Sequence, residues 1–377
     1  MKGRHQKQEP SDRPSGALFD SYSAFKKAAA NWYKPPYAYG IFGTDTVQAF
    51  EQEMMNREGA QFAVAFPSGM AAIAATFISL SAKRDRKILV QDDIYTVGKM
   101  FCDRILESFG IETHYCAPEK LTPDDLVNAS LLYLENPSYK HYQSIDLAAV
   151  IARAKAAGVP SVVDNSLMTY IHQKPLEMGA DVVLYSASKH VAGHGDVLLG
   201  VVMTNDEATY RKIRDTQILL GMAVSSSDCA LALRGLETLE MRLEQECDTT
   251  ASLIEDMAQW PWVERIEATH VSVENGTVKA HTQPHADMPA LPLFSMRLKG
   301  TYDESALETM SQAFQTIKIG YGWGATQSII LPEIDENGVV TMRLAVGIEG
   351  QARIAKDLQS GYQALSTHQA PKASLRP

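Results

Sequence analysis

A lysine near the middle of the chain directly follows a short apolar run. The run covers Asp181–Tyr185, and the chain continues as Ser186-Ala187-Ser188-Lys189-His190. Open α/β sheets bind ligands at the carboxyl ends of their strands, where this lysine is expected to lie. A lysine amine that is desolvated, or close to another cation, loses its proton and can form an imine with an aldehyde. The hydroxyls of Ser186 and Ser188 could bind a phosphate, although this short motif alone more often marks a solvated lysine.

A glycine turn earlier in the chain is suited to bind an anion. Phe66-Pro67-Ser68-Gly69-Met70 ends one apolar run and opens a helical pattern. Glycine lets the backbone approach a phosphate closely, and a helix N-terminus offers free N–H groups and a favourable dipole. By itself, the segment could equally be a plain strand-to-helix turn.

An aspartate and a tyrosine complete the set of candidate residues. Asp164 ends the apolar run before Asn165, where it could pair with a protonated pyridine nitrogen and make the ring an electron sink; a helix N-cap is the ordinary alternative. Tyr95 follows another predicted strand and could lie flat against an aromatic ring, although such tyrosines are usually packing residues. Together with Lys189, these residues describe the binding of one phosphorylated pyridine aldehyde, pyridoxal 5′-phosphate.

Alternating strand and helix patterns must position these residues. Amphipathic segments such as 99–109 and 146–157 separate the predicted strands, which indicates a mainly parallel sheet covered by helices. The predicted strands are Gln61–Phe66, Lys87–Gln91, Ser130–Leu134, Ser161–Val163, Asp181–Tyr185 and Leu198–Thr204.

The pattern changes after about residue 205. Long helical segments, 208–221 and 227–256, precede strand-like pieces with turn signals at Asn275-Gly276 and Asn337-Gly338. We therefore predict an N-terminal arm over residues 1–43, a large cofactor-binding domain over 44–235 and a smaller C-terminal α+β domain over 236–377.

Composition excludes several classes of function. The formal net charge is −10 without a basic run, which argues against nucleic-acid binding. The longest apolar stretch is interrupted by Pro67-Ser68-Gly69, so no membrane span is expected, and the polar N-terminus lacks a secretory signal. The four cysteines are scattered without metal-ligand spacing, so we expect reduced thiols, no metal site and a cytoplasmic protein.

The motifs together resemble the Cys/Met-metabolism family of pyridoxal-phosphate enzymes, which includes cystathionine β-lyase and γ-synthase. The resemblance covers roughly residues 37–365. It rests on Tyr39-Gly40 with Gly43-Thr44, Ser68-Gly69-Met70-Ala71-Ala72, Glu135-Asn136-Pro137-Ser138, Asp164-Asn165, Ser186-Ala187-Ser188-Lys189, Gly193-His194-Gly195-Asp196, Leu233-Arg234-Gly235-Leu236-Glu237-Thr238-Leu239 and Arg343-Leu344-Ala345-Val346-Gly347-Ile348-Glu349.

The resemblance implies a fold-type I architecture and a role for each candidate residue. The sheet would be mainly parallel and seven-stranded, with helices on both faces and a smaller C-terminal α+β domain. Lys189 would be the Schiff-base lysine and acid/base, Asp164 would pair with the ring nitrogen, and Tyr95 would stack on the ring. The implied phosphate ligands are Ser68, Gly69, Met70, Ser186 and Ser188.

Substrate binding and assembly are also implied. Arg343 would clamp the substrate carboxylate with its planar fork of donors. Tyr39 would reach the phosphate in a neighbouring subunit, which implies a dimer within a homotetramer. Trp323 resembles the β-lyase branch, as does the segment Phe101-Cys102-Asp103, and with Tyr95 it would line the substrate pocket.

Some positions depart from the family pattern. Ile41 stands where the family has an arginine that contacts the phosphate, and the sequence does not reveal what replaces it. Ser188 stands in place of threonine, His190 in place of an aromatic residue and Gly322 in place of serine. These changes surround the predicted substrate pocket.

We therefore predict a carbon–sulfur lyase that acts on cystathionine or a related amino acid by β-elimination and gives pyruvate, ammonia and a thiol. The alternative is γ-elimination or γ-replacement, including a specialised lyase that converts a halogenated unsaturated amino acid to an alkyne. A relative that binds the cofactor without turnover is a third possibility, supported by Ile41.

Overall fold

The computed structural model describes residues 17–81, 87–281 and 288–367. These pack as two compact units. Of the described residues, the first unit contains those within 17–140, 145–192 and 196–237, and the second contains those within 141–144, 193–195 and 238–367. Among the described residues, no helix is both long and apolar enough to cross a membrane.

The first unit is built on a seven-stranded sheet in the order β1-β7-β6-β5-β4-β2-β3. Only β7 runs antiparallel to its neighbours. The prediction of a mainly parallel sheet is therefore confirmed, as is the fold-type I architecture. The strands are β1 (Phe62–Phe66), β2 (Lys87–Gln91), β3 (Thr113–Cys116), β4 (Ala129–Glu135), β5 (Ser161–Asp164), β6 (Val182–Tyr185) and β7 (Gly200–Thr204).

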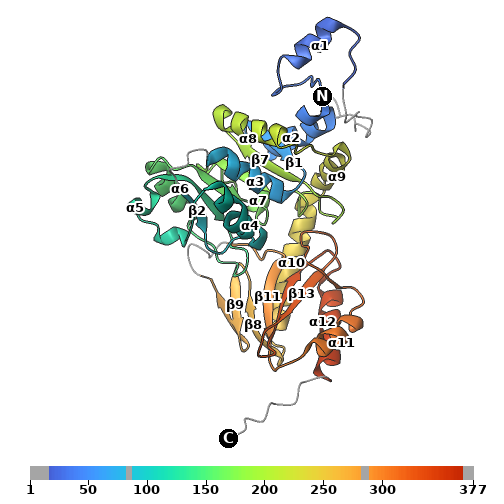
Figure 1. The fold of residues 1–377 in the computed structure, drawn as a ribbon. Coiled ribbons are helices and arrows are strands. Elements are labelled where there is room, and N and C mark those ends of the chain that lie inside the picture. Colours follow the sequence, from blue (N-terminus) through green and yellow to red (C-terminus); the bar gives the residue numbers. More distant parts are fainter. Residues whose placement is uncertain (1–16, 82–86, 282–287, 368–377) are drawn as a thin grey trace. The chain divides into compact units, whose positions relative to one another are not determined.

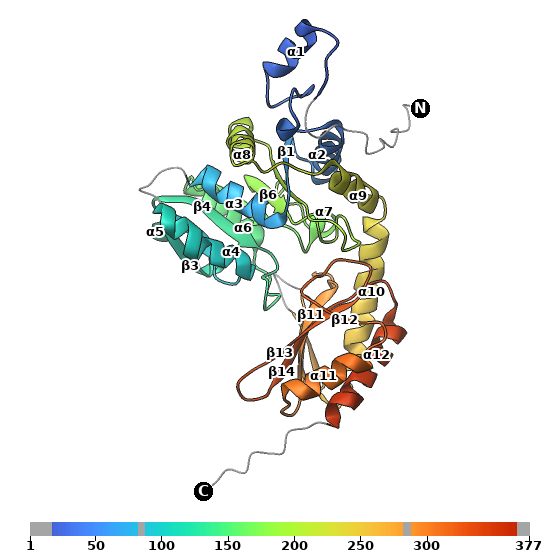
Figure 2. The same cartoon turned by 45° about the vertical axis from the view of Figure 1, so that its right-hand side comes forward.

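Helices cover both faces of this sheet, and Figures 1 and 2 show α3 and α6 beside its strands. The helices are α1 (Tyr22–Ala29), α2 (Asp45–Glu58), α3 (Gly69–Leu80), α4 (Thr96–Phe101), α5 (Pro123–Leu126), α6 (Leu147–Ala156), α7 (Thr169–His172), α8 (Glu207–Leu219) and α9 (Ser226–Leu236). Short η helices, η1 (Gly40–Phe42), η2 (Cys102–Leu106), η3 (Glu107–Phe109) and η4 (Pro118–Lys120), complete the unit.

Alternation along the strands divides the core into two layers. In β4, Leu131 and Tyr133 belong to a core cluster with side chains from α3 and α8, whereas Leu132 and Leu134 pack with the α6 side. In β5, Val162 lies on the Tyr133 side and Val163 on the α6 side. Because successive side chains of a strand point to opposite faces, Glu135 and Asp164 emerge on the same face as Tyr133.

The second unit has a seven-stranded sheet of its own, in the order β10-β9-β8-β11-β14-β13-β12. It is antiparallel except for the β12–β13 pair. The strands are β8 (Val263–Glu267), β9 (Val271–Glu274), β10 (Thr277–Ala280), β11 (Leu293–Leu298), β12 (Lys318–Ile319), β13 (Ile329–Ile334) and β14 (Val340–Ala345). Its helices, α10 (Leu239–Met257), α11 (Glu304–Ala313) and α12 (Gln351–Ser366), share one apolar core with one face of the sheet.

Three local predictions differ from the structure. Strand β3 was not predicted, because it is a half-exposed edge strand with a polar pattern. The predicted helical segment 227–256 is divided into two helices, because α9 ends at Leu236 and α10 begins at Leu239. The segment 99–109 contains a π-helical turn rather than a regular helix. The Asn275-Gly276 hairpin turn is confirmed, with both residues at positive φ.

Candidate active site

The carboxyl ends of the parallel strands bring several candidate residues together. Asp164 is the last residue of β5, and Ser186 directly follows β6. A third residue, Ser166, joins them: its N–H and hydroxyl both donate to Asp164 Oδ1, over 2.9 and 2.6 Å, and its Oγ accepts the N–H of Ser186 over 2.6 Å. Two candidate positions on neighbouring strands are thereby held in fixed register. Ser166 was not singled out from the sequence, although its place two residues after Asp164 could have drawn attention to it.

The N-terminus of α3 lies against the same strand ends. Ser68 is the N-cap residue, and its Oγ accepts the N–H of Ala71 over 3.0 Å. A Cβ atom placed on Gly69 would lie 2.8 Å from both Cβ and Oγ of Ser186, and one on Gly200 would lie 2.4 Å from the Ser68 carbonyl oxygen. A side chain at either position would therefore clash, at Gly69 with Ser186 of the segment before Lys189 and at Gly200 with the backbone of Ser68. Met70 is half-buried on the first turn of α3.

The segment that carries Lys189 is a compact turn after β6. The Lys189 N–H donates to the Ser186 carbonyl over 3.1 Å, and the residue is half-buried. The Ser188 hydroxyl donates to the Leu199 carbonyl over 3.1 Å and accepts the Leu199 N–H over 2.9 Å. The single hydroxyl proton of Ser188 is used in its bond to Leu199, so Ser188 ties the lysine turn to the segment before β7. The hydroxyl of Ser186 instead faces Gly69.

Asp164 is a half-buried carboxylate with three donors. Tyr133 Oη donates to Oδ2 over 3.2 Å, in addition to the two bonds from Ser166. Burial raises the pKa of Asp164, and the hydrogen bonds from Ser166 and Tyr133 oppose that rise because they stabilise the charged form. A cationic partner beside Asp164 would stabilise its charged form and lower its pKa.

Tyr95 stands at the start of α4 and is held through its backbone. Its N–H donates to both carboxylate oxygens of Glu135, over 2.9 and 3.0 Å. Its ring meets that of Tyr139 edge-on, with centroids 5.4 Å apart. Glu135 entered the sequence analysis only as part of a motif, and the structure places it in contact with the candidate residue Tyr95.

Tyr39 lies in the segment that leads to α2 and does not reach the strand ends described above. Its side chain is 54% exposed and contacts Phe42 edge-on, with centroids 6.1 Å apart. Ile41 lies within the short helix η1. The N-terminal part of the predicted arm, residues 1–16, lies outside the described residues, and the rest contains helix α1.

Arg343 and Trp323 belong to the second unit. Arg343 lies on β14, and its Nη2 donates to the Tyr321 carbonyl over 2.7 Å. This bond fixes the guanidinium beside the loop that carries Trp323, and both side chains are half-buried. Arg343 shares the polar face of the sheet with Ser295, its register partner on β11.

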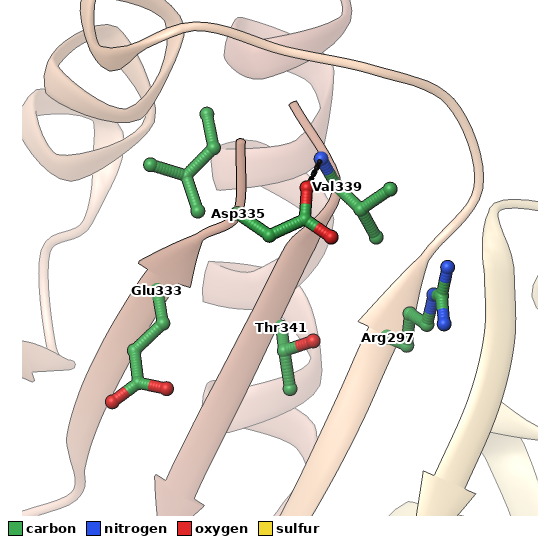
Figure 3. A pocket seen from close by; sticks show the side chains of 6 residues that line it. Arg297, Glu333, Asp335, Val339 and Thr341 are labelled. Carbon is green, nitrogen blue, oxygen red and sulfur yellow. Dashed lines mark hydrogen bonds between the residues drawn. The ribbon is translucent and has the colours of Figure 1, made fainter. Parts of the chain in front are cut away.

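A hollow on the second unit contains none of the candidate residues. Figure 3 shows that it lies at the turn between β13 and β14, where Asp335 Oδ1 accepts the N–H of Val339 over 2.9 Å. It is lined by Arg297, Glu333, Ile334, Asp335, Val339 and Thr341. Asp335 serves to close the turn, so the hollow is accounted for by the hairpin.

The described residues fit a phosphorylated pyridine aldehyde. The close approach of Gly69 to Ser186 leaves a bare helix N-terminus for a phosphate, and the Asp164 carboxylate supplies an anion for a ring nitrogen. The comparison with known proteins decides the family. The family model described as "Cys/Met metabolism PLP-dependent enzyme" matches residues 4–363. The chain belongs to this family. Enzymes of the family depend on pyridoxal 5′-phosphate (PLP).

Two kinds of relative are found in this PLP-dependent family. Cystathionine beta-lyase of Escherichia coli K12 is 28% identical over 372 residues, covering 93% of this chain and 92% of the relative. The Bacillus subtilis cystathionine beta-lyase is 30% identical over 343 residues, with 88% and 87% covered. Cystathionine gamma-lyase of Bos taurus is 28% identical over 391 residues, with 98% and 94% covered. Identity at this level therefore does not separate the β- and γ-branches.

Solved structures support the fold. Cystathionine gamma synthase of Xanthomonas oryzae, in complex with aminoacrylate and cysteine, superposes with a TM-score of 0.79 at 23% identity, covering 94% of this chain and 92% of that one. Cystathionine gamma-lyase of Lactobacillus plantarum, complexed with L-serine, gives a TM-score of 0.78 at 24% identity, with 93% and 92% covered.

Proposed function

We propose that this enzyme is a carbon–sulfur lyase that acts by β-elimination on cystathionine or a related sulfur amino acid and gives pyruvate, ammonia and a thiol. The observation that carries the proposal is the linked set of Asp164, Ser166 and Ser186 beside the glycine turn at Gly69. The preference for the β-branch rests on the resemblance of the Trp323 segment to that branch.

Lys189 would hold PLP covalently, with Gly69, Met70 and the hydroxyls of Ser68 and Ser186 around the phosphate. Ser188 would then act mainly by fixing the lysine turn through Leu199. When bound, PLP supplies an electron sink for the pair left by α-proton removal.

The side chains divide the work of the reaction. The Nζ of Lys189 would act as the acid/base group, taking the substrate α-proton and giving a proton to the departing sulfur. Asp164 would keep the ring nitrogen protonated, and Tyr95 would stack on the ring face. Arg343 binds the substrate carboxylate through donors that its bond to Tyr321 leaves available, since a guanidinium has five N–H groups.

Tyr39 is proposed to act in a neighbouring subunit, because its exposed side chain contacts only nearby Phe42 in the interactions described above. The enzyme would then be a dimer of active sites within a homotetramer. A mixture of Lys189→Ala and Tyr39→Phe chains, refolded together, should regain activity that neither variant has alone. Failure of the mixture, with hetero-oligomers formed, would contradict the shared site.

The decisive experiment is a substrate panel followed by the identity of the keto acid. Cystathionine and other sulfur amino acids should release pyruvate and ammonia. Formation of 2-oxobutyrate would favour γ-elimination, and release of halide from a halogenated unsaturated amino acid would favour the specialised lyase. PLP binding without any product would favour the non-catalytic relative. Borohydride should trap the cofactor on Lys189 in wild type and in Lys212→Ala, but not in Lys189→Ala.

A further inference from the structure

A single hydroxyl group lies between a buried carboxyl group, that of Glu135, and a half-buried one, that of Asp164, in the first unit. Tyr133 Oη is 3.2 Å from Asp164 Oδ2 and 3.4 Å from Glu135 Oε1. Glu135 and Asp164 are register partners on the neighbouring strands β4 and β5. The Tyr133 ring is fully buried and packs edge-on against Phe77, with centroids 4.9 Å apart, so the hydroxyl cannot turn towards solvent. Because a hydroxyl has one proton, it can donate to only one of the two groups.

The two carboxyl groups are unequal. Burial raises the pKa of Glu135 well above its usual range and the charge of Asp164 raises it further, although the hydrogen bonds from Tyr95 and Tyr133 oppose that rise. Asp164 is half-buried, and the two bonds from Ser166 stabilise its charged form. Two carboxylates this close do not both ionise readily, so the negative charge falls on Asp164 and the proton on Glu135. Cys102, the other titratable group that faces Tyr133, is neutral because burial raises its pKa to about 12.

Glu135 also positions the residue proposed to stack on the cofactor ring. Both of its oxygens accept the N–H of Tyr95, and its own N–H donates to Gln91 Oε1 over 3.1 Å. One continuous chain of hydrogen bonds therefore joins Tyr95, Glu135, Tyr133 and Asp164. Its two ends are the proposed contacts to the face and to the nitrogen of one pyridine ring.

We propose that Tyr133 and Glu135 are positioning residues, in which a neutral Glu135 carboxyl group directs the Tyr133 hydroxyl proton onto Asp164 while holding Tyr95 by its backbone N–H. The proposal rests on the proposed function, because it assumes that Asp164 receives the ring nitrogen. Donation from Tyr133 makes Asp164 a weaker base, so the proton shared with the ring stays on the nitrogen. The chain thus keeps the ring positively charged.

The test is the pH dependence of the visible absorption of the PLP-loaded enzyme. Tyr133→Phe removes the donor, so Asp164 takes a larger share of the proton that it shares with the ring nitrogen. The pH midpoint of the absorption titration should therefore rise by about half a pH unit to one unit. The ¹⁵N resonance of ring-labelled cofactor should move towards that of a neutral pyridine. Glu135→Gln keeps a neutral donor towards Tyr133, so it should titrate as wild type. Glu135→Ala leaves Asp164 as the acceptor of the Tyr133 hydroxyl proton, so its titration should lie closer to that of wild type than to that of Tyr133→Phe.

A matched control is Tyr210→Phe, since the Tyr210 hydroxyl is also largely buried but donates to the Tyr33 carbonyl over 2.9 Å. Thermal unfolding of the cofactor-free variants shows whether each folds. An unchanged titration in Tyr133→Phe would overturn the proposal, and so would a shift in Glu135→Gln as large as that in Tyr133→Phe. A wild-type protein that gains no visible absorption with PLP would instead refute the proposed function.

Discussion

The hydroxyl of Ser186 lies against the backbone of Gly69, so that a β-carbon at residue 69 would be 2.8 Å from the Ser186 Oγ. The contact joins the first residue of α3 to the segment that leads to Lys189. It brings a helix N-terminus to a strand end, which is the arrangement that binds phosphate in many α/β proteins.

Gly69→Ala should weaken PLP binding. The added methyl group must displace Ser186 or the first turn of α3, and either movement disturbs the proposed phosphate site. We expect the dissociation constant for PLP to rise at least tenfold, which corresponds to about 1.4 kcal/mol. Titration of the cofactor-free protein with PLP, followed by absorption, measures it.

Gly320→Ala is the matched control for this substitution. A Cβ on Gly320 would meet Ile329 Cγ2 at 3.5 Å, an ordinary van der Waals contact in the second unit. Its affinity for PLP should equal that of wild type. Equal affinities in all three proteins would show that the contact at Gly69 does not shape the phosphate site.

Much of the site could be predicted because strand ends and glycine turns leave local signals. Ser68, Gly69 and Asp164 all adjoin apolar runs that end abruptly, and the structure brings these ends together. Tyr133 and Glu135 could not be recognised in the same way. A tyrosine inside an apolar run is usually core, and only the pairing of β4 with β5 places its hydroxyl at Asp164.

Edge strands and long-range polar contacts also escaped prediction. Strand β3 pairs with β2 at one edge only, so its half-exposed sequence has no apolar run. The role of Ser188 in holding Leu199 depends on a return of the chain eleven residues later, for which the sequence contains no signal. The substrate branch depends on pocket side chains, which local patterns do not fix.

Arg343→Lys should weaken substrate binding while PLP remains bound. Lysine cannot keep the donor to Tyr321 and also present a bidentate fork to a carboxylate. A lost charge-assisted hydrogen bond is worth about 1.5–3 kcal/mol, so KM should rise about 10- to 150-fold. Arg297→Lys is the control, because Arg297 lies on the neighbouring strand β11 and pairs with Glu264 instead. An equal rise in KM for both variants would argue against a specific role for Arg343.

Glu58 should make the stability of the protein depend on pH. It is fully buried at the end of α2, accepts a hydrogen bond from Tyr185, and burial raises its pKa to about 7. The folded state therefore binds a proton more tightly than the unfolded state, whose glutamate has an ordinary pKa near 4.5. This contribution to stability is complete below about pH 4.5 and is lost as the pH rises through 7.

Glu58→Gln should flatten this profile. The amide stays neutral, so the unfolding free energy of the variant should fall less than that of wild type between pH 5 and 8. The difference between the two falls should be at most about 3 kcal/mol. Urea unfolding of the cofactor-free protein across this range measures the difference. Glu53→Gln, on the same helix but paired with Arg57 at the surface, should follow the wild-type profile. Parallel profiles for wild type and Glu58→Gln would mean that Glu58 is already ionised at pH 5.

Glu51→Ala should destabilise the first unit strongly. Glu51 is buried, accepts two hydrogen bonds from Arg214 Nη2 over 2.7 and 2.8 Å, and accepts the N–H of Ala65 over 2.8 Å. It thereby joins α2, α8 and β1. Its removal leaves the buried Arg214 guanidinium without this partner, which costs about 3–5 kcal/mol in such pairs. Glu53→Ala removes a half-buried i,i+4 pair with Arg57 and should cost below about 1 kcal/mol. Similar midpoints of urea unfolding for the two variants would show that the buried Glu51–Arg214 pair contributes no more than the Glu53–Arg57 pair.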